Sequence, residues 1–379
     1  MITADSNAAR LAHFFDTIHT LRSRNDLSHG MHPYPAKFIS QIPHELLAVY
    51  GVRAAPVLDP MCGSGTALVE ATVEGYEAIG IDINPIATLV ARAKTTVLYD
   101  EECASLRKLA ARLRDLAEGP RSDGTTVELP DFLNRDKWFG RHVLCELAVA
   151  KELILGEPDS VQPFALAALS SILVAVSNQE SETRWCARPR TIPPGETLRR
   201  LSAQLLGNVR RAEAYRQRSL ASAVVVRADA RSLPMATGTV GTIVTSPPYA
   251  NSHDYYLYNK LRMFVLGFDV LATQTAEIGS RNRHSDKKEP IEAYIAAMRE
   301  ALTEWRRVLA EGGRACVVVA DAVVRGELFD MADGFHELAL ATGFELESAF
   351  KFNHRPLNAL FQRGFGTRME KHTHVLIFR

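Results

Sequence analysis

The fold is decided by the stretch Asp59-Pro60-Met61-Cys62-Gly63-Ser64-Gly65-Thr66. It follows a short apolar run, residues 55–58, that predicts a strand, and it precedes an amphipathic helix expected over residues 67–74. A second predicted strand covers residues 78–81 and ends at Asp82. This is a strand–turn–helix–strand unit with an acidic residue at the tip of its second strand. Nucleotide-type ligand sites in doubly wound sheets have this arrangement.

The glycines of this turn let the backbone bend tightly and approach a ligand. The stretch lacks both the GxxxxGK spacing of a triphosphate-binding loop and a full GxGxxG dinucleotide fingerprint. A short Gly-Ser-Gly-Thr turn before a helix suits a ligand that brings a carboxylate and an amino group to the helix N-terminus. The methionine part of S-adenosylmethionine has both groups, so the turn predicts this cofactor.

Two aspartates at the ends of predicted strands are candidates to bind the rest of that cofactor. Asp82 offers two carboxylate oxygens, which suit the two ribose hydroxyls. Its alternative role is to cap a helix ahead of Pro85. Asp229 follows the strand predicted over residues 223–226 and is placed to receive the adenine amino group.

A second turn, Thr245-Ser246-Pro247-Pro248-Tyr249, follows the strand predicted over residues 241–244. Its prolines fix a rigid, extended backbone. The amino group of an aromatic base is a poor nucleophile because its lone pair is delocalised into the ring, and acceptors that take its protons localise that pair. The Ser246 hydroxyl oxygen and the Pro247 carbonyl are the candidate acceptors, and Tyr249 is the candidate to stack on a base. In-line positioning supplies the rest, without a covalent enzyme intermediate.

The chain divides into three segments: residues 1–98, residues 99–219, which are predicted to be mostly helical, and residues 220–379. The outer two have alternating strand and helix patterns, and a last strand pair is expected to close the sheet as a hairpin. The expected fold class is therefore α/β, with a doubly wound, mostly parallel sheet, a C-terminal antiparallel hairpin and an inserted helical domain. Within the insertion, residues 177–185 are expected to form a polar loop.

The two turns together resemble the cofactor and catalytic motifs of the DNA amino-methyltransferases. TSPPY is similar to their (D/N/S)PP(Y/F) motif, and its serine is similar to the cytosine-N4 branch, since aspartate is usual in adenine-N6 enzymes. His32-Pro33-Tyr34-Pro35-Ala36-Lys37-Phe38 looks like the segment of this branch that packs against the methionine part of the cofactor. The resemblance implies a Rossmann-like class I methyltransferase fold, S-adenosylmethionine as cofactor, and transfer to the N4 of a cytosine flipped out of duplex DNA.

The patterns and the resemblance together give one set of site residues. The expected catalytic residues are Ser246, Pro247, Pro248 and Tyr249. The expected cofactor-binding residues are Lys37, Phe38, Asp59, Pro60, Cys62, Gly63, Gly65, Thr66, Asp82, Ile83, Asp229, Ala230 and Thr245. Residues 1–98 and 220–379 would form the catalytic domain and residues 99–219 a domain for target recognition. No metal site is expected.

The order of the motifs is informative, because the cofactor turn precedes the catalytic motif by about 180 residues. Many cytosine-N4 members have the reverse, circularly permuted order, and here the insertion fills the gap. A cytosine-C5 mechanism needs a nucleophilic cysteine, typically in a Pro-Cys pair, and the sequence contains no such pair. Cys62 is expected to pack within the turn rather than to react.

DNA contacts are expected from two basic regions. Nine arginines and two glutamates lie between Arg184 and Arg218, which suits phosphate contacts, although a solvated helix face is the alternative. Residues 280–288 form a basic stretch that suits a lid, a DNA clamp or simply an exposed loop. The candidate DNA-contacting residues are Tyr249, Asn251, His253, Asp254, Arg184, Trp185, Arg188, Arg190, Arg281 and Arg283, with His354-Arg355-Pro356 as a further candidate.

Composition sets the remaining expectations. Lys plus Arg and Asp plus Glu number 44 each, so a nucleic-acid enzyme of this composition must gather positive charge on one face. The five cysteines include no CxxC pair, which argues against a zinc ribbon or disulfide scaffold and fits a reducing cytoplasm, expected to be bacterial or archaeal. Neither a secretory leader nor a membrane span is expected. A separately encoded restriction endonuclease is a possible partner.

Three alternatives remain open from the sequence. The first is the same chemistry on the N6 of adenine. The second is an RNA amino-methyltransferase, which can share both motifs but usually carries an appended RNA-binding module that the sequence does not suggest. The third is a catalytically silent DNA-binding protein that uses this fold as a platform, although both halves of the site look intact.

Overall fold

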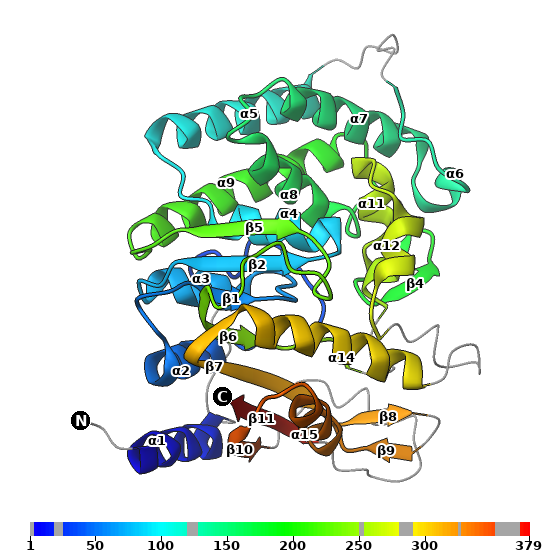
Figure 1. Ribbon diagram of the computed structural model, residues 1–379. Coiled ribbons are helices and arrows are strands. Elements are labelled where there is room, and N and C mark those ends of the chain that lie inside the picture. The colour runs from blue at the N-terminus through cyan, green and yellow to red at the C-terminus, as the bar shows by residue number, and fades with distance from the viewer. Residues whose placement is uncertain are drawn as a thin grey trace.

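Seven strands of the described chain form one sheet in the computed structural model, in the spatial order β10-β11-β7-β6-β1-β2-β5 (Figure 1). The structure describes residues 4–18, 26–119, 128–249, 254–279, 291–324, 327–352 and 372–379. The strands of this sheet are Val57–Asp59 (β1), Ala78–Asp82 (β2), Ala223–Arg227 (β5), Val240–Thr245 (β6), Leu309–Ala320 (β7), Leu346–Phe352 (β10) and Thr373–Phe378 (β11). β11 runs antiparallel to β7 and β10, and the remaining pairs are parallel. The predicted mostly parallel sheet with a C-terminal antiparallel pair is confirmed.

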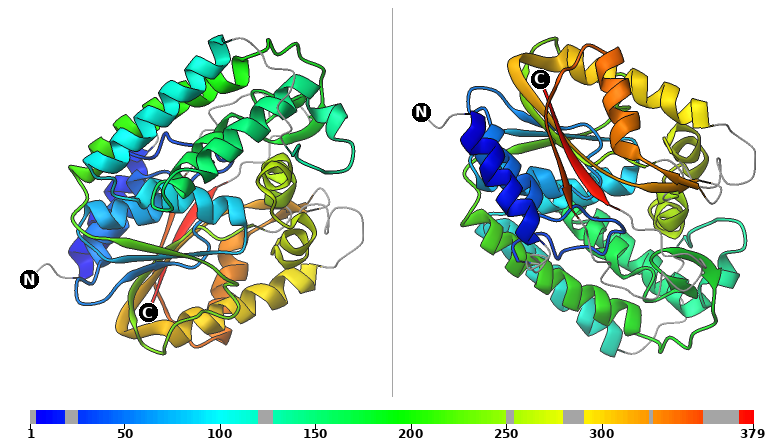
Figure 2. Two further views of the ribbon diagram at one scale, coloured as in Figure 1. Left: turned by 90° about the horizontal axis from the view of Figure 1, so that it is seen from above. Right: turned by 90° about the horizontal axis from the view of Figure 1, so that it is seen from below.

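Helices cover both faces of this sheet (Figure 2). They are α14 (Ile291–Val308) and α15 (Met331–Ala341) on one face, and α1 (Ala4–Thr17), α2 (Gln41–Tyr50) and α3 (Thr66–Val73) on the other. Along β7, Val317 packs in the core under α14 and the next residue, Val318, packs in the core under α1. Because both faces of the sheet are buried, its central strands are apolar throughout.

Helix α4 (Pro85–Thr95) connects the sheet to the helical segment that follows it. The Asn84 side chain caps this helix by accepting hydrogen bonds from two backbone N–H groups of its first turn. Ala91 packs in the core of the sheet, whereas Leu89 and Ala93 pack in the core of the helical segment. Every residue of the helix except Arg92 is buried. One short helix therefore belongs to two cores at once.

The segment predicted to be helical contains α5 (Asp100–Glu118), α6 (Arg135–Trp138), α7 (Arg141–Leu155), α8 (Gln162–Ile172) and α9 (Glu196–Arg216). The segment is mostly helical, as predicted. Their core also includes Leu261 and Val265 of α11 (Lys260–Leu266), a helix that follows the catalytic motif. Because this core is shared with the flanking parts of the chain, the division into catalytic and recognition domains stays a prediction.

The shorter elements complete the described chain. They are α10 (Tyr255–Tyr258), α12 (Val270–Ala276), and the paired strands β8 (Ala322–Val324) and β9 (Glu327–Phe329). None of the helices in the described ranges is long and apolar enough to cross a membrane.

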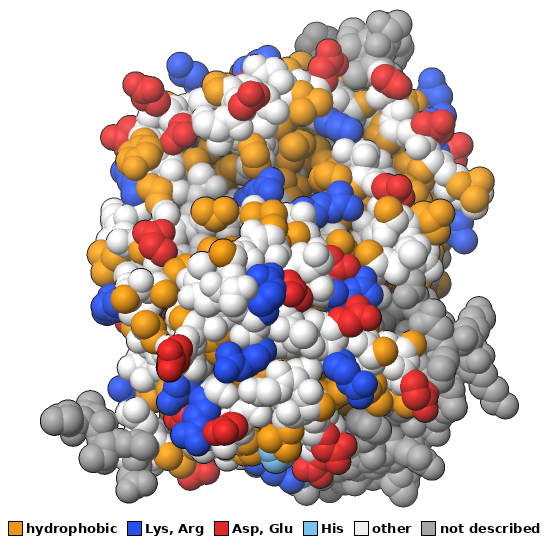
Figure 3. All heavy atoms as spheres, viewed as in Figure 1, with side chains coloured by type: hydrophobic (Ala, Val, Ile, Leu, Met, Phe, Trp, Pro, Cys, Tyr) orange, Lys and Arg blue, Asp and Glu red, His pale blue; other side chains and the backbone are white. Residues whose placement is uncertain are grey.

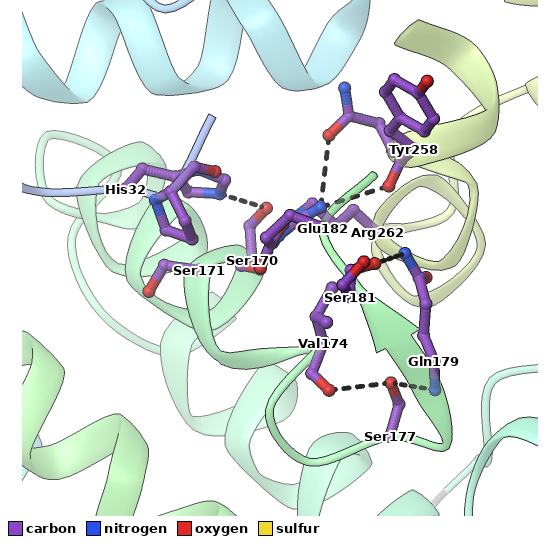
Figure 4. A network of polar contacts seen from close by, with 12 residues as sticks. His32, Ser170, Ser171, Val174, Ser177, Gln179, Ser181, Glu182, Tyr258 and Arg262 are labelled. Carbon is purple, nitrogen blue, oxygen red and sulfur yellow. Dashed lines mark hydrogen bonds and ion pairs between the residues drawn. The ribbon is translucent and has the colours of Figure 1, made fainter. Parts of the chain in front are cut away.

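The polar loop expected over residues 177–185 is wrong, because these residues begin a two-stranded hairpin. It is formed by β3 (Gln179–Ser181) and β4 (Arg184–Ala187). Internal hydrogen bonds engage several of its polar groups: the Gln179 side chain donates to the Ser181 carbonyl at 2.8 Å, and the Ser177 hydroxyl donates to the Val174 carbonyl at 3.1 Å (Figure 4). Polar residues read as solvent-exposed in the sequence are in part buried here because they bond to one another.

Arg262 joins this hairpin to the helices around it (Figure 4). Its side chain is only 1% exposed and donates to the Ser170 carbonyl of α8 at 3.1 Å, to the Tyr258 carbonyl at 3.3 Å and to the Glu182 carboxylate at 2.5 Å. The His32 ring lies 3.0 Å from the Ser170 hydroxyl. A buried guanidinium needs this many acceptors, so it fixes α8, α11 and the hairpin relative to one another.

The glycine turn offers a test of the packing between α3 and α4. Gly65 has a φ of +76°, and a Cβ built on it would lie 2.9 Å from the Cβ of Ala91 in α4. We expect Gly65→Ala to lower the free energy of unfolding by about 2–4 kcal/mol, because backbone strain and a steric clash combine. Urea denaturation measures this loss.

Gly238→Ala is the matched control for that substitution. Gly238 has a φ of +69°, but nothing lies within 4 Å of a Cβ built there. It should therefore show the backbone strain alone, about 1–2 kcal/mol. Equal losses for the two variants would contradict the close approach of α4 to the turn.

Candidate cofactor and catalytic site

A cavity lies at the carboxyl edge of the sheet and holds about 920 Å³ of space, counted out to its open mouth. The ends of β1, β2, β5 and β6 form its floor, and residues 34–38 and 276–278 help to cover it. Thirteen predicted residues line it: Lys37, Phe38, Asp59, Pro60, Cys62, Gly63, Thr66, Asp82, Ile83, Asp229, Ala230, Ser246 and Pro248. Carboxyl ends of parallel strands meet at one edge, so residues far apart in the sequence share one cavity.

Asp82 holds the glycine turn in place. One of its carboxylate oxygens accepts a hydrogen bond from the Gly63 backbone N–H at 2.8 Å, and the other accepts from the Asn84 N–H at 2.8 Å. The alternative role of Asp82 as a helix cap is wrong, because Asn84 caps α4. Each Asp82 oxygen keeps a further lone pair that can face a ligand.

Three carboxyl groups give the cavity its electrostatic character, and of these Asp59 and Glu277 are buried and Asp82 is partly buried. Burial raises the pKa of Asp59 to about 7, that of Asp82 to about 6 and that of Glu277 to about 8. Lys37 is the one basic side chain among the lining residues of the described chain, and its Nζ donates to the His29 carbonyl at 3.4 Å. Such a cavity favours a ligand that brings positive charge.

The cavity fits the predicted cofactor. S-Adenosylmethionine carries an ammonium and a sulfonium, which suit the carboxyl groups, and Asp59 and the glycine turn lie where its amino-acid end is expected. Ile83, Ala230 and Ile278 supply apolar lining for a flat base. Burial raises the pKa of the Cys62 thiol well above its usual value, so Cys62 stays protonated and is packed rather than reactive.

Asp229 lines the cavity but is paired with a neighbouring arginine. Its carboxylate accepts from Arg231 at distances of 2.6 to 3.1 Å, and the Arg231 backbone N–H also donates to it at 2.9 Å. Although burial raises the pKa of Asp229, these hydrogen bonds outweigh it and lower that pKa. An adenine amino group at this position would have to share the carboxylate with the guanidinium.

The segment over residues 26–40 is fastened to α3 by a buried ionic cluster. The His29 ring donates to the Glu70 carboxylate at 2.7 Å, and the His44 ring lies 3.4 Å from the same carboxylate. Further along the segment, the Tyr34 ring stacks on that of Tyr255 with centroids 6.2 Å apart. Both tyrosines line the cavity, so this cluster and this stack position one wall of it.

The catalytic turn leaves the end of β6 and is held from behind. The Ser246 and Tyr249 hydroxyls lie 3.0 Å apart, and the Tyr294 hydroxyl of α14 donates to the Pro248 carbonyl at 3.0 Å. The Tyr249 ring is half-buried against the core under α14. Ser246 therefore faces the cofactor cavity from a turn whose backbone is fixed.

Four predicted site residues lie near the cavity without lining it. Gly65 packs on α4, Thr245 is buried beside Asp59 and lowers its pKa, and Pro247 and Tyr249 lie behind Ser246 and Pro248. The sequence also missed ten lining residues: Tyr34, Ala36, Met61, Ser64, Ala67, Asn84, Tyr255, Ala276, Glu277 and Ile278. Tyr34, Ala36, Met61 and Ser64 lie within the quoted motifs, whereas Glu277 and Ile278 follow α12 with no strand end or motif to mark them.

Several predicted DNA contacts have partners within the protein. Trp185 packs on Trp138 with ring centroids 4.1 Å apart and carries the Lys260 ammonium 5.2 Å from its ring, so it is not an open stacking platform. Arg184 pairs with Glu180 at 3.3 Å. Arg190 donates to two backbone carbonyls, at 3.1 and 2.7 Å. The sequence alone does not reveal these contacts, because they depend on the β3–β4 hairpin and on the residues packed around it.

The other predicted DNA contacts are distributed as follows. Arg188 is exposed, whereas Asp254 is buried at the start of α10. Asn251, His253, Arg281, Arg283 and residues 354–356 lie outside the described residues. Further along the insertion, Glu196 pairs with Arg199 and Arg200, and Asp100 pairs with Arg216. On the face shown in Figure 3, acidic and basic side chains are interspersed, so this face has no patch of a single sign.

One group of possible metal ligands lies outside the cavity. Asp321, Asp330 and His374 bring ligand atoms within 4.8 Å of one another. The His374 ring donates to Asp321 at 2.9 Å, and Asp330 caps α15 by accepting from two backbone N–H groups. The hydrogen bond between His374 and Asp321 joins β11 to the end of β7, and this structural role explains why the side chains lie together.

Two family descriptions match the parts of the chain that build this site. Residues 240–370 match a family described as DNA methylase, and residues 34–109 match one described as RMKL-like, methyltransferase domain. The first match contains the catalytic turn and the second contains the cofactor turn. The matches support a DNA amino-methyltransferase family for this chain, and that family implies S-adenosylmethionine as its cofactor.

Two curated relatives agree with this assignment. The chain is 28% identical over 256 residues to Type II methyltransferase M.MvaI of Kocuria varians, which covers 62% of this chain and 56% of the relative. It is 31% identical over 122 residues to Type II methyltransferase M.MjaII of Methanocaldococcus jannaschii, which covers 32% of this chain and 19% of the relative. The chain thus spans about half the length of the first relative and a fifth of the second.

Two of the solved structures that the chain matches, both with low TM-scores, are as follows. A putative DNA modification methylase from Thermus thermophilus shares 21% identity, with a TM-score of 0.25 over 40% of this chain and 50% of that one. A SAM-dependent methyltransferase from Methanosarcina mazei shares 12% identity, with a TM-score of 0.33 over 92% and 97% of the two chains.

The ionic cluster under the cavity wall predicts a pH-dependent stability. Burial raises the pKa of Glu70, but hydrogen bonds from His29 and His44 outweigh it and lower that pKa to about 2. The resulting stabilisation is present above pH 4.5, the ordinary pKa, and is lost as the pH falls toward 2. We expect Glu70→Gln to lower the free energy of unfolding by up to about 3 kcal/mol at pH 7.

Denaturant unfolding between pH 7 and pH 3 measures this, and the difference from the wild type should narrow below pH 4.5. Glu74→Gln is the matched control, because Glu74 pairs with the same His44 at 3.3 Å but is 30% exposed. It should cost under about 1 kcal/mol. A Glu70→Gln loss that is small or independent of pH would contradict the proposed fastening of the wall.

Proposed function

We propose that this chain is a site-specific DNA methyltransferase that transfers a methyl group from S-adenosylmethionine to the exocyclic N4 amino group of cytosine. The observation that carries the proposal is that Ser246 and Pro248 of the catalytic turn line the same cavity as Asp59 and Asp82 of the cofactor site. A methyl donor bound at one and a base amino group at the other would be adjacent. Both curated relatives are named Type II methyltransferases, which supports methyl transfer.

The roles of the chain's own residues follow from the geometry. The cofactor supplies an electrophilic methyl group on a sulfonium. The Ser246 oxygen accepts a hydrogen bond from the amino group of the target base, and the Pro247 carbonyl is the second acceptor, so the nitrogen lone pair is directed at the methyl group. The proton that the amino group loses passes to solvent, and no covalent enzyme intermediate forms. Positioning provides most of the rate enhancement.

The target base reaches this cavity only when it is outside the duplex, so the proposal includes base flipping. Tyr249 is the residue proposed to stack on the base, using the part of its ring that the core leaves uncovered. Burial raises the pKa of its hydroxyl, so it stays protonated and can donate to Ser246. We infer that the helical segment over residues 99–219 contacts the target sequence. We further propose that the enzyme has a separately encoded restriction endonuclease as its partner.

Nucleoside mass spectrometry of duplex DNA treated with the protein and S-adenosylmethionine tests the proposal. We expect N4-methylcytosine, and we expect Ser246→Ala to lower its rate of formation by roughly 10²-fold because one of two acceptors is lost. Thr237→Ala, at an exposed position in the turn before β6, is the control and should be unchanged. N6-methyladenine as the sole product would overturn the choice of base, and methylation of RNA alone would overturn the DNA substrate.

Tyr294 is expected to be a positioning residue for the same turn. Tyr294→Phe removes the hydrogen bond to the Pro248 carbonyl and keeps the buried ring. We expect kcat to fall by about tenfold, with little change in KM for either substrate, because a small displacement of the turn misaligns the base. Single-turnover methylation assays measure this.

Tyr76→Phe is the matched control for that variant. The Tyr76 hydroxyl also donates to a backbone carbonyl from a buried position, that of Leu47 at 3.2 Å, but on the far side of the cofactor turn from the base. An equal fall in kcat for the two variants would show that Tyr294 acts through general stability alone.

A further inference from the structure

Glu277 is a cavity carboxyl group that no motif marks. It follows α12, is 7% exposed, and faces the cavity from the cover rather than from the sheet edge. The Tyr256 backbone N–H lies 3.2 and 3.3 Å from its two carboxylate oxygens, and its own N–H donates to the Thr273 carbonyl at 3.1 Å. The carboxyl group is therefore held in place by the backbone on both sides.

The groups that face Glu277 are acidic or phenolic. Asp254 and Asp82 are close enough for their charges to raise its pKa, and the charge of Glu277 in turn raises the pKa of Tyr34 and Tyr255. Asp59 and Asp82 line the same cavity, and none of these three lining carboxyl groups forms an ion pair within the described chain. The fourth lining carboxylate, Asp229, already has Arg231 as its partner. Three lining carboxyl groups thus lack an ion-pair partner among the described residues, although Lys37 lines the same cavity.

A buried carboxyl group without a cation is costly to ionise, and burial raises the pKa of Glu277 to about 8. The group is therefore largely protonated at neutral pH in the free protein. A ligand that places a positive charge beside it reverses this balance, because the ionised form then gains a partner. A neutral ligand of the same shape gives no such gain.

The cofactor and its product differ by one positive charge. S-Adenosylmethionine carries a sulfonium, and loss of the methyl group leaves S-adenosylhomocysteine with a neutral thioether. The ammonium and carboxylate of the amino-acid end are common to both, so Asp59 and the glycine turn do not distinguish them. A residue that distinguishes the two ligands must lie near the sulfur atom, between the site of the ribose and the catalytic turn. Glu277 lines the same cavity as Asp82, the residue expected at the ribose, and is close enough for the charge of Asp82 to raise its pKa.

We propose that Glu277 is the counter-ion of the cofactor sulfonium, so that it selects S-adenosylmethionine over S-adenosylhomocysteine and weakens product binding after each transfer. This inference rests on the proposed function, because it assumes that the cavity binds this cofactor. It assigns a role in cofactor discrimination to a residue outside both motifs. It also predicts that binding of S-adenosylmethionine releases a proton below about pH 8, whereas binding of S-adenosylhomocysteine releases fewer.

Isothermal titration calorimetry of the purified full chain with each ligand tests this, in buffers of different ionisation enthalpy so that released protons are counted. We expect Glu277→Gln to weaken S-adenosylmethionine binding by about tenfold and S-adenosylhomocysteine binding by less than about twofold. The extra proton release with S-adenosylmethionine should disappear. Wild-type affinity for S-adenosylmethionine should rise from pH 6 to pH 8 more steeply than in the variant.

The glutamine amide oxygen can still accept from Tyr256, so the fold should be retained, and a thermal melt checks this. Glu152→Gln, at an exposed position on α7, is the control and should leave both affinities unchanged. Glu277→Asp keeps the charge with a shorter reach and should retain part of the preference, which provides a second variant should the glutamine protein unfold.

The outcomes separate the inference from the function on which it rests. Equal weakening of both ligands, or of neither, overturns the role of Glu277 while the cofactor site stands. If the wild-type protein binds neither ligand, the proposed function itself is overturned.

Discussion

The hydrogen bonds from Gly63 and Asn84 to the Asp82 carboxylate are the contacts on which the rest of the site depends. They connect the turn after β1 to the end of β2, so the two strand ends that form the floor of the cavity have a fixed separation. The glycine turn then starts α3 at an angle that lets Gly65 touch α4. A carboxylate that accepts backbone N–H groups in this way organises the loop before any ligand arrives.

The residues that cover the cavity belong to segments outside the sheet. The segment over residues 26–40 is held by the Glu70 cluster, and residues 276–278 are held through α10 and α12. The catalytic turn is fixed by Tyr294 from α14. Each wall thus has its own anchor, and the cavity needs all of them to be in place at once. Such preorganisation suits a reaction whose main requirement is alignment.

The position of α4 explains how a helical segment of this size is attached without a separate hinge. Because Ala91 belongs to the core of the sheet and Leu89 to that of the helical segment, motion of one core relative to the other would expose this helix. Arg262 adds a second connection, since its guanidinium bonds to groups of α8, of the hairpin and of α10. The helical segment is thus held to the sheet by packing through α4 and by the hydrogen bonds of Arg262.

The sequence by itself determined the sheet, the two turns and most of the cavity floor. Apolar periodicity, paired glycines and a Pro-Pro step are local properties, and Asp59, Asp82 and Ser246 are placed by strand ends that must meet at one edge. Only the tertiary structure decided what covers that edge. Glu277 carries no local signal because its role comes from burial beside Asp82, and Trp185 looked free because its partner, Trp138, is distant in the sequence. Burial and pairing depend on contacts between segments that are remote along the chain. A sequence pattern can therefore predict the chemistry of the site, but not which side chains already have partners within the protein.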